Sequence, residues 1–447
     1  MLTRFPGIFL LALALTRPAL PQTSPDIQKV LDRLDRLEDE NRKLLDEIRA
    51  LRNELQQPRA EPSASAAPAP VAERLDVQES RTAELAQSKV EASQKLPVSL
   101  TGMLLFNSFI NGKYGGGAED PLSAGRTAGA ATSGATLRQT VLGLKFNGPD
   151  LPWGGKASGS LYMDFFAGSL SPGNNLLHIR VAALDLAWKN TTITVGQDKP
   201  LIAPREPMSL AQVGVSPLTG AGNLWAWQPQ IRIEQRFSLG GDSGLRAQAG
   251  VYQTSETYSS LLPPYYAGTL ERARPGYEGR LEFFHGNETR RIEIAPGFHV
   301  SDTHVTGMSV PSRIVSLDWL VKPVAMVEFS GALFRGENVA VLGARQGFNI
   351  LPSGAAIPVH SQGEWGQLAL FPASRLSVHF YAGDERDRAA DLGTGGATRN
   401  FVYAGNFIYK LAPNVLAAIE LSQARTQYLG SGLHLNNHYD LAIAYLF

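Results

Sequence analysis

The chain has 447 residues, 44 glycines and no cysteine, and its 41 basic residues balance 41 acidic ones. Without cysteine it forms no disulfide or thiolate metal site, as suits an exported protein. The zero net charge gives no reason to expect a nucleic-acid partner. Beyond the N-terminus no apolar run reaches the ~18 residues of a spanning helix, whereas a membrane β-barrel leaves near-neutral hydropathy because only alternate residues face lipid.

The first segment, residues 1–22, has the pattern of a secretory signal peptide. Arg4 supplies the positive start, and the apolar run Ile8–Leu15 supplies the hydrophobic centre. Residues 16–22 match the small-residue cleavage pattern poorly, so the cleavage point stays open. A buried N-terminal helix is the alternative interpretation.

Residues 26–56 carry a strict heptad repeat, which predicts a periplasmic coiled coil. Its a and d positions are Ile27, Val30, Leu34, Leu37, Asn41, Leu44, Ile48, Leu51 and Leu55, with charged residues between them. An ordinary surface helix would drift off such a repeat. The pattern therefore indicates a homo-oligomer, although the mixed core does not fix its stoichiometry. Residues 57–96, rich in proline and alanine at first and charged later, predict a linker or spacer.

From residue 97 to residue 447 the apolar residues alternate with polar ones, and we expect sixteen antiparallel strands forming a transmembrane barrel. Short links such as Lys189-Asn190 and Lys322-Pro323 alternate with long ones such as Asn111–Ala135 and Gly336–Val359. Membrane barrels show this alternation between short periplasmic turns and long external loops. Sixteen strands leave room for a water-filled lumen.

The C-terminal strand has one clearly apolar face. Counting back from the terminus, Phe447, Tyr445, Ile443, Leu441 and Tyr439 share one parity, which predicts the lipid-facing side. The terminal aromatic residue resembles the signature that outer-membrane proteins present to their insertion machinery. Both outer-membrane lipid and that machinery are therefore expected partners.

The opposite parity carries the charges, which are costly against lipid but acceptable in a wet lumen. The predicted pore-lining residues are Lys145, Asp164, Arg180, Arg232, Glu234, Arg236, Arg246, Glu278, Arg280, Glu282, Arg291 and Glu293, and in the later strands Asp318, Glu328, Glu364, Arg375 and Glu420. Their order suggests a basic wall facing an acidic wall across the pore. Ion pairs filling the wall are the alternative.

The long link 199–223 is apolar and proline-rich, which makes it a poor solvated loop. We expect it to fold into the lumen as a constriction, with Arg205 and Glu206 narrowing the path. Packing against a neighbouring subunit is the alternative. Guanidinium groups suit carboxylate or phosphate solutes, so small polar solutes, and anionic ones in particular, are expected.

Four short stretches carry a family resemblance: Arg138–Lys145, Met163–Phe166, Ile179–Ala182 and Val195–Gln197. With the heptads, the sixteen strands and the terminal Phe447, the sequence resembles the DcaP-like trimeric porins of outer membranes. The resemblance implies a trimer joined by a three-stranded periplasmic coiled coil, and diffusion of small anionic solutes such as dicarboxylates. The dense lysine and arginine ladder of phosphate-selective porins is missing.

Two other classes of function were weighed. The eight histidines are scattered and form no catalytic cluster, so no catalytic residue, metal or cofactor is predicted and an enzyme is disfavoured. A structural anchor, whose coiled coil contacts the cell wall or a periplasmic partner, stays open because the helix and linker could reach one.

Overall fold

The computed structural model describes residues 98–116, 118–167, 175–253, 270–271, 275–305 and 308–447. The predicted signal peptide, coiled coil and linker (1–22, 26–56 and 57–96) lie outside the described residues. No helix in the described ranges is both long and apolar enough to cross a membrane.

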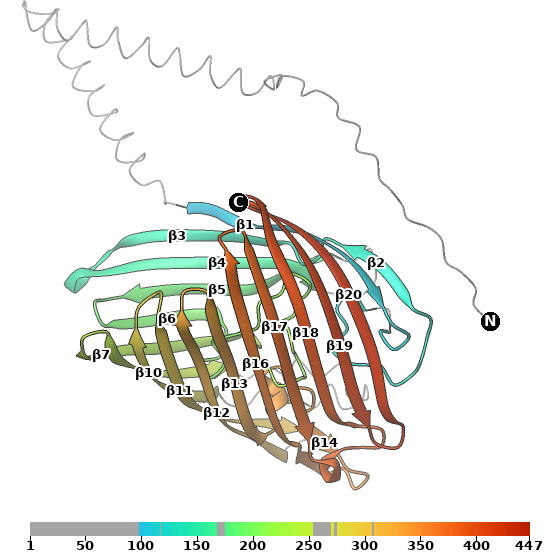
Figure 1. Cartoon of the computed structure of the whole chain (residues 1–447). Coiled ribbons are helices and arrows are strands. Elements are labelled where there is room, and N and C mark those ends of the chain that lie inside the picture. Colours follow the sequence, from blue (N-terminus) through green and yellow to red (C-terminus); the bar gives the residue numbers. More distant parts are fainter. Residues whose placement is uncertain (1–97, 117, 168–174, 254–269, 272–274, 306–307) are drawn as a thin grey trace, which may run out of the picture. The chain divides into compact units, whose positions relative to one another are not determined.

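The described residues form one large antiparallel sheet that closes on itself (Figure 1). The sixteen barrel strands are β1 (Val98–Asn111), β3 (Val141–Leu151), β4 (Gly155–Ala167), β5 (Leu176–Ala187), β6 (Thr191–Asp198), β7 (Gln228–Gly240), β8 (Ser243–Gln253), β10 (Pro275–Gly286), β11 (Arg291–Val305), β12 (Met308–Val324), β13 (Val327–Glu337), β16 (His360–Ala373), β17 (Leu376–Asp387), β18 (Ala397–Ala412), β19 (Val415–Tyr428) and β20 (Gly432–Leu446). The predicted sixteen-stranded antiparallel barrel is therefore confirmed.

Closure is made by the first and last strands. β20 pairs with β1 from Met103↔Leu446 to Asn111↔His438, so every barrel strand has a neighbour on both sides. A closed barrel leaves no row of unpaired backbone groups, which is a requirement for a sheet that meets lipid.

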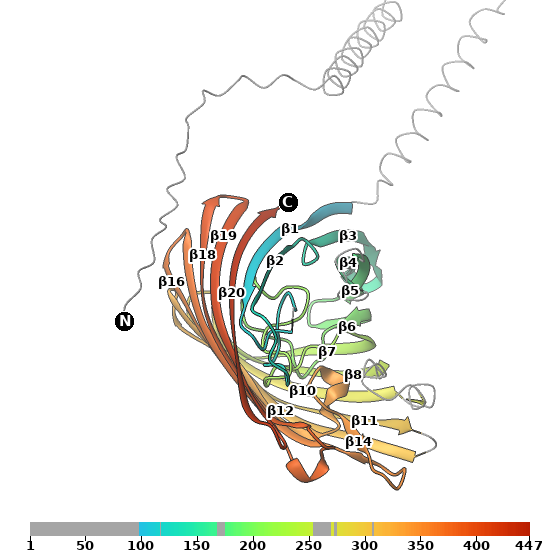
Figure 2. The ribbon, with the colours of Figure 1, turned by 90° about the vertical axis from the view of Figure 1, so that its right-hand side faces the viewer.

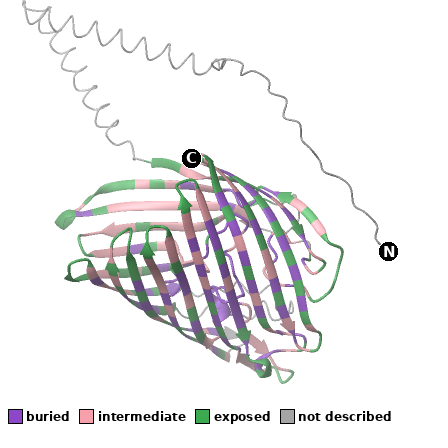
Figure 3. Ribbon diagram, in the orientation of Figure 1, coloured by how far each residue is buried: buried purple, intermediate pink, exposed green. Residues whose placement is uncertain are grey.

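Alternation of burial along the strands shows which face is which (Figure 3). In β20 the residues from Leu433 to Tyr445 alternate strictly between exposed and buried. The five residues expected on the lipid face of this strand, Tyr439, Leu441, Ile443, Tyr445 and Phe447, are 38–48% exposed and apolar or aromatic, whereas His438 and Asp440 are buried on the inner face.

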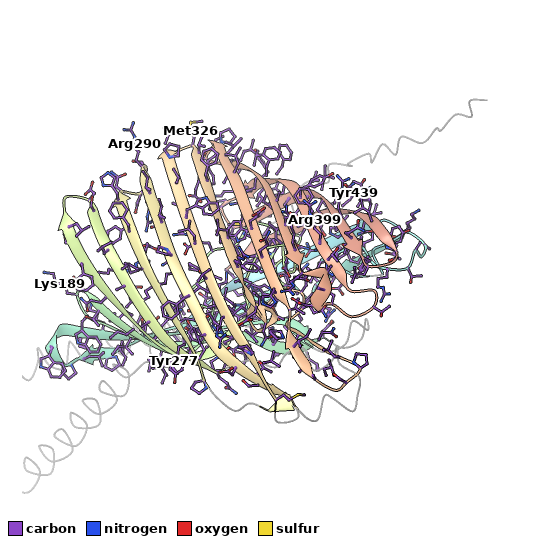
Figure 4. All side chains as sticks on the ribbon, turned by 90° about the horizontal axis from the view of Figure 1, so that it is seen from below. Lys189, Tyr277, Arg290, Met326, Arg399 and Tyr439 are labelled. Carbon is purple, nitrogen blue, oxygen red and sulfur yellow. The ribbon has the colours of Figure 1, made fainter. Side chains whose placement is uncertain are left out.

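The connections differ in length at the two ends of the barrel. At one end the chain turns at 152–154, 189–190, 241–242, 287–290, 325–326, 374–375 and 413–414. The other end carries the long links, including 112–131, 199–227 and 338–359. Figure 4 shows Arg290 and Met326 at the short-turn end and Tyr277 at the opposite end. One expected turn was misplaced: Lys322-Pro323 lies within β12, which continues to Val324 before the turn.

The second strand is interrupted, which the sequence did not indicate. The expected link Asn111–Ala135 contains β2 (Thr132–Thr136), which pairs with the end of β1, while β3 pairs with its start. Between them the chain leaves the sheet, and the Leu105 amide donates to Thr140 Oγ1 (3.1 Å). Because of this break, Arg138 and Gln139 do not belong to a strand. Both side chains are buried, and Gln139 hydrogen-bonds to a loop inside the barrel. Three further short strands lie in long links, β9 (Leu270–Glu271), β14 (Phe348–Ile350) and β15 (Ala356–Pro358).

Apolar packing inside the barrel involves loops as well as strands. Leu210 packs with Leu105, Ile408 and three alanines of β19 and β20. Leu218 and Ala221 pack on Trp365 and Tyr381. The link 338–359 contributes the buried 3-10 turn Val339–Leu342, whose residues pack with Ile202 and Leu224. Figure 2 shows this irregular chain between the opposite strand walls.

Candidate functional site in the barrel lumen

The link 199–227, here called the inner loop, enters the lumen directly after β6. Its first residues contact the wall formed by β8 and β10: the Leu201 amide donates to Tyr252 Oη (2.9 Å) and the Ile202 amide to Glu278 Oε2 (3.3 Å). Leu201 and Ile202 are almost fully buried there. Burial of these apolar residues explains why so hydrophobic a link is not solvated.

The inner loop then crosses to the wall formed by β16–β20 and β1, which we call the amide wall because its contacts come mainly from buried amide side chains. Asn406 Nδ2 donates to the Met208 carbonyl (2.8 Å), and Asn107 Nδ2 donates to the Leu210 carbonyl (2.8 Å). Ser209 Oγ donates to Glu420 Oε2 (2.6 Å). These contacts satisfy loop backbone groups that would otherwise be buried without partners.

The loop returns past the interrupted second strand. Gln139 Oε1 accepts from the amides of Val213 (2.5 Å) and Gly214 (2.9 Å), and Gln139 Nε2 donates to the Ala211 carbonyl (2.8 Å). A single side chain thus holds three consecutive parts of the loop backbone. The break in the second strand is what places it there.

Arg205 joins the inner loop to the wall formed by β7, β8 and β10–β12, which we call the charged wall. Its Nε lies 3.1 Å from Asp318 Oδ1, its Nη2 contacts Glu293, and the same Nη2 lies 3.8 Å from Glu282 Oε2. Arg280 lies beside it, with Nε 2.7 Å from Asp318 Oδ2 and Nη2 2.6 Å from Glu282 Oε2. The two guanidinium groups therefore share the same buried carboxylates.

The charged wall continues this pattern across its strands. Arg246 lies 3.5 Å from both Glu282 and Glu234, and Arg291 contacts Glu293. Positive and negative side chains alternate along single strands, as Arg280 with Glu282 on β10 and Arg291 with Glu293 on β11 show. The expected separation into a basic and an acidic wall is therefore wrong for these residues, and ion pairs within one wall are what the structure has.

A second charge cluster surrounds the start of the inner loop. Glu206 accepts from Lys199 Nζ (2.7 Å) and Ser216 Oγ (2.7 Å). Burial alone would raise the pKa of Glu206, but the Lys199 charge and these hydrogen bonds outweigh it and hold the pKa below its ordinary value. Arg180 lies 3.6 Å from Asp164 and stacks on Trp227 at 4.7 Å. Glu206 therefore joins two parts of the inner loop to each other. Arg180 lies on β5, opposite this part of the loop.

All twelve predicted pore-lining residues of β3–β11 lie on the inner parity of their strands. The pairings beyond the two clusters are Arg232 with Asp198 (2.6 Å), Arg236 with Glu234 (2.8 Å) and Glu278 with His299 (2.9 Å). Two later residues are misplaced. Arg375 lies in the exposed turn 374–375 and not on a strand. Glu364 pairs in register with the exposed Leu333 on the outer face, and its neighbour Trp365 points inward. Trp365 is inside because the inner loop gives it an apolar contact.

Four inward lysines, Lys145, Lys156, Lys322 and Lys410, form no ion pair among the described residues. Lys145, Lys322 and Lys410 lie near the short-turn ends of β3, β12 and β18. On the neighbouring strands they lie opposite Ser99, Arg291 and Leu416, respectively, which are at the same end of the barrel. In their lack of an ion pair within the described ranges, they differ from the arginines farther in, whose guanidinium groups contact carboxylates.

The link 112–131 also folds against the amide wall, at the long-loop end. Tyr428 Oη donates to the Ala124 carbonyl (2.7 Å), and the Ala124 amide donates to Thr426 Oγ1 (2.9 Å). Asp120 is buried in this link. Burial and the nearby Glu119 charge raise the pKa of Asp120 to about 8.

Sequence patterns missed most of the groups that hold the loops. Asn107, Asn406 and Gln139 are buried amides with several hydrogen bonds, yet the sequence around them does not distinguish them from other polar residues of a barrel. An amide on the inner parity of a strand is a weak signal, because a wet lumen also tolerates it. No group of three or more metal-ligating side chains occurs in the described part of the chain.

A closed barrel of sixteen antiparallel strands, with unequal links at its two ends and a long loop folded inside, is the fold of bacterial outer-membrane porins. The outer membrane channel DcaP of Acinetobacter baumannii has a similar structure, with a TM-score of 0.62 at 15% identity over 78% of this chain and 97% of that chain. An anion-selective porin from Comamonas acidovorans is also similar, with a TM-score of 0.52 at 13% identity over 78% of this chain and 99% of that chain. No protein-family model matches the sequence, and no curated protein matches it.

Proposed function

We propose that this chain is an outer-membrane porin that allows passive diffusion of small polar, mainly anionic solutes. The observation that carries this proposal is the inner loop, which is bound to both walls of a closed barrel through Arg205 on one side and Asn406 on the other. A loop held in this way narrows a pore without crossing its wall. The outer face, which carries exposed apolar side chains on most strands of the barrel, suits an outer membrane.

The preference for anions rests on the distribution of free charge. Within the two buried clusters the arginines are paired with carboxylates, whereas Lys145, Lys322 and Lys410 at the short-turn end form no ion pair among the described residues. Uncompensated charge at the mouth of a low-dielectric passage raises the local concentration of counter-ions. The similarity to a porin described as anion-selective agrees with this preference.

The proposed assembly is based on the heptad repeat and on the resemblance of the sequence to trimeric porins. We propose a homotrimer held in the periplasm by the heptads of residues 26–56, after export directed by residues 1–22. The strand ending in Phe447 would present its apolar face, from Tyr439 to Tyr445, to lipid and to the insertion machinery.

Conductance across a planar bilayer tests the proposal. The purified full chain should give stepwise openings in groups of three, with a reversal potential under a salt gradient whose sign indicates anion preference. Replacing Lys145, Lys322 and Lys410 by glutamine should shift the reversal potential toward the value of a cation-selective pore. The control Lys189→Gln, on the exposed short turn between β5 and β6, should leave the reversal potential unchanged. Folded protein without any conductance would refute the porin and favour an anchor.

A further inference from the structure

Arginines also gather on the outer face of the barrel, at the long-loop end. Six of them point outward from neighbouring strands or their ends, and we call them the arginine belt: Arg313, Arg335, Arg386, Arg388, Arg399 and Arg425. The side chains of Arg313, Arg386, Arg388 and Arg399 are 48–69% exposed. At the same end of β4–β8 and β10, the described residues of the outer face include no arginine or lysine.

Register brings part of the belt into one row. Arg335 lies opposite Gln362, Gln362 opposite Arg386, and Arg386 opposite Arg399. Neighbouring strands are about 4.8 Å apart, so three guanidinium groups lie within four strands. Like charges directly opposite each other repel unless an anion lies between them. Binding of an anionic group between these arginines would therefore reduce their mutual repulsion.

Carboxylates within the chain satisfy only part of the belt. Asp384 accepts from Arg386 Nε (2.8 Å) and Arg399 Nε (2.7 Å), and Glu337 lies 3.3 Å from Arg313. Arg388 lies 3.4 Å from Asp391, a carboxylate that also binds His360 Nδ1 at 2.8 Å. Glu364 is a further acidic residue nearby, on β16 of the same face. Arg335 and Arg425 have no such partner among the described residues.

The surface is hollowed at this level. A cavity of about 430 Å³ is lined by Arg313, Arg335, Arg386, Arg388 and His360, and a second of about 410 Å³ by Arg399, Arg425, Phe401 and Leu433. The two unpartnered arginines thus lie in separate hollows. Each hollow can admit an anionic group to a guanidinium from outside.

Apolar side chains lie directly below the belt on the same face. Val315 follows Arg313 by two residues, Leu333 precedes Arg335 by two, and Phe401 follows Arg399 by two. Two residues of a strand span about 6.6 Å. Val315 is 62% exposed and Leu333 is 41% exposed. A ligand here would meet positive charge at one level and an apolar surface at the next.

We propose that the arginine belt binds the phosphate groups of an outer-leaflet phosphorylated glycolipid, whose acyl chains lie along the apolar residues below. Guanidinium groups bind phosphate through paired hydrogen bonds, and the belt faces the outer leaflet when long loops are external. A free phosphate ion would use the arginines alone and gain nothing from the apolar surface. The proposal rests on the outer-membrane location of the barrel and not on the solute it passes.

Binding of lipid A to the full chain in detergent tests this proposal, measured by titration with dephosphorylated lipid A and inorganic phosphate as separate probes. The double variant Arg335→Gln/Arg425→Gln breaks no ion pair of the described chain, so folding should be retained. We expect it to weaken lipid A binding by about tenfold or more, because charge-assisted hydrogen bonds are lost. The matched control Lys189→Gln/Arg290→Gln, with the same charge change at the short-turn end (Figure 4), should bind as the unmodified chain does.

Four outcomes would overturn the proposal. Equal affinity of the double variant and the control would show that the belt is not the site. Equal binding of dephosphorylated lipid A would show that the belt does not recognise the phosphate groups. Competition by millimolar inorganic phosphate alone would show that the ligand is a free phosphate ion. A change in oligomer mass in the double variant would assign the belt to contacts between copies of the chain. Conductance measured on the same samples reports separately on the porin function.

Discussion

The charged wall and the amide wall hold the same inner loop by different physical means. On the charged wall, Arg205 enters a set of buried carboxylates that Arg280 already shares. On the amide wall, Asn107 and Asn406 donate to loop carbonyls, and small apolar residues such as Ala442 fill the space between. The difference teaches that charge fixes strands and loop together on one side, whereas neutral hydrogen bonds fix only the loop backbone on the other.

Removing the centre of the charged wall should have the largest effect. Arg280→Met leaves Glu282 and Asp318 buried with too little positive charge, and breaking a buried pair in this way costs about 3–5 kcal/mol. Unfolding in urea, measured on the barrel in lipid vesicles, would show this loss. Arg236→Met, whose side chain is 55% exposed, should cost about 1 kcal/mol or less. Equal losses for the two variants would mean that the network is not a structural centre.

A matching change on the amide wall should be smaller and more local. Asn406→Leu keeps the approximate volume but removes the donor to the Met208 carbonyl and one of the donors to Glu420, at about 1–3 kcal/mol. Hydrogen exchange should accelerate in residues 208–214 before it does in the strands. Asn437→Leu, on the outer face of β20, should leave this exchange unchanged. Uniform acceleration across the barrel would contradict the division between the two walls.

The charge of Arg205 should influence ions more than it influences folding. Arg205→Gln keeps a donor for the carboxylates but removes one positive charge beside the passage. Charges about 4 Å apart in water interact by about 1 kcal/mol, so the anion-to-cation permeability ratio should fall by about fivefold. Reversal potentials measure this ratio, and Lys189→Gln is the control. An unchanged ratio would place the permeating ions away from Arg205.

The smallest effect on the barrel should come from pH, through the link 112–131. Because the pKa of Asp120 is raised in the folded protein to about 8, folding favours its protonated form. The packing of this link should therefore weaken as pH rises from about 4 to about 8 and change little above that. Hydrogen exchange of residues 118–124 would report the change. Asp120→Asn should remove the pH dependence, and its persistence would show that another group is responsible.

Strand number and facing could be predicted from the sequence because lipid imposes apolar alternation on every strand. The same rule failed at Glu364 and Trp365, because it assumes that everything inside is wet. Here the inner loop makes part of the interior apolar, so an inward tryptophan is stable. The strand β2 was missed because Thr132–Thr136 contains no large apolar residue.

Partners of the charged side chains were harder to predict than their facing. Each ion pair of the charged wall depends on which residues of adjacent strands lie opposite one another, and a slip of one residue changes all of them. Arg205 illustrates this limit: its place in a long loop was predicted, but its three carboxylate partners come from β10, β11 and β12.

The inner loop also constrains the order in which the molecule can form. It bonds to Asn107 on β1 and to Glu420 on β19, and Asn107 in turn bonds to Asp440 on β20 (3.0 Å), 333 residues away in the chain. This set of contacts exists only once the first and last strands have met. Docking of the loop is thus expected as a late folding event, following the slow closure that such distant contacts require. The time at which residues 208–214 become protected from hydrogen exchange during folding would then report when the barrel closes.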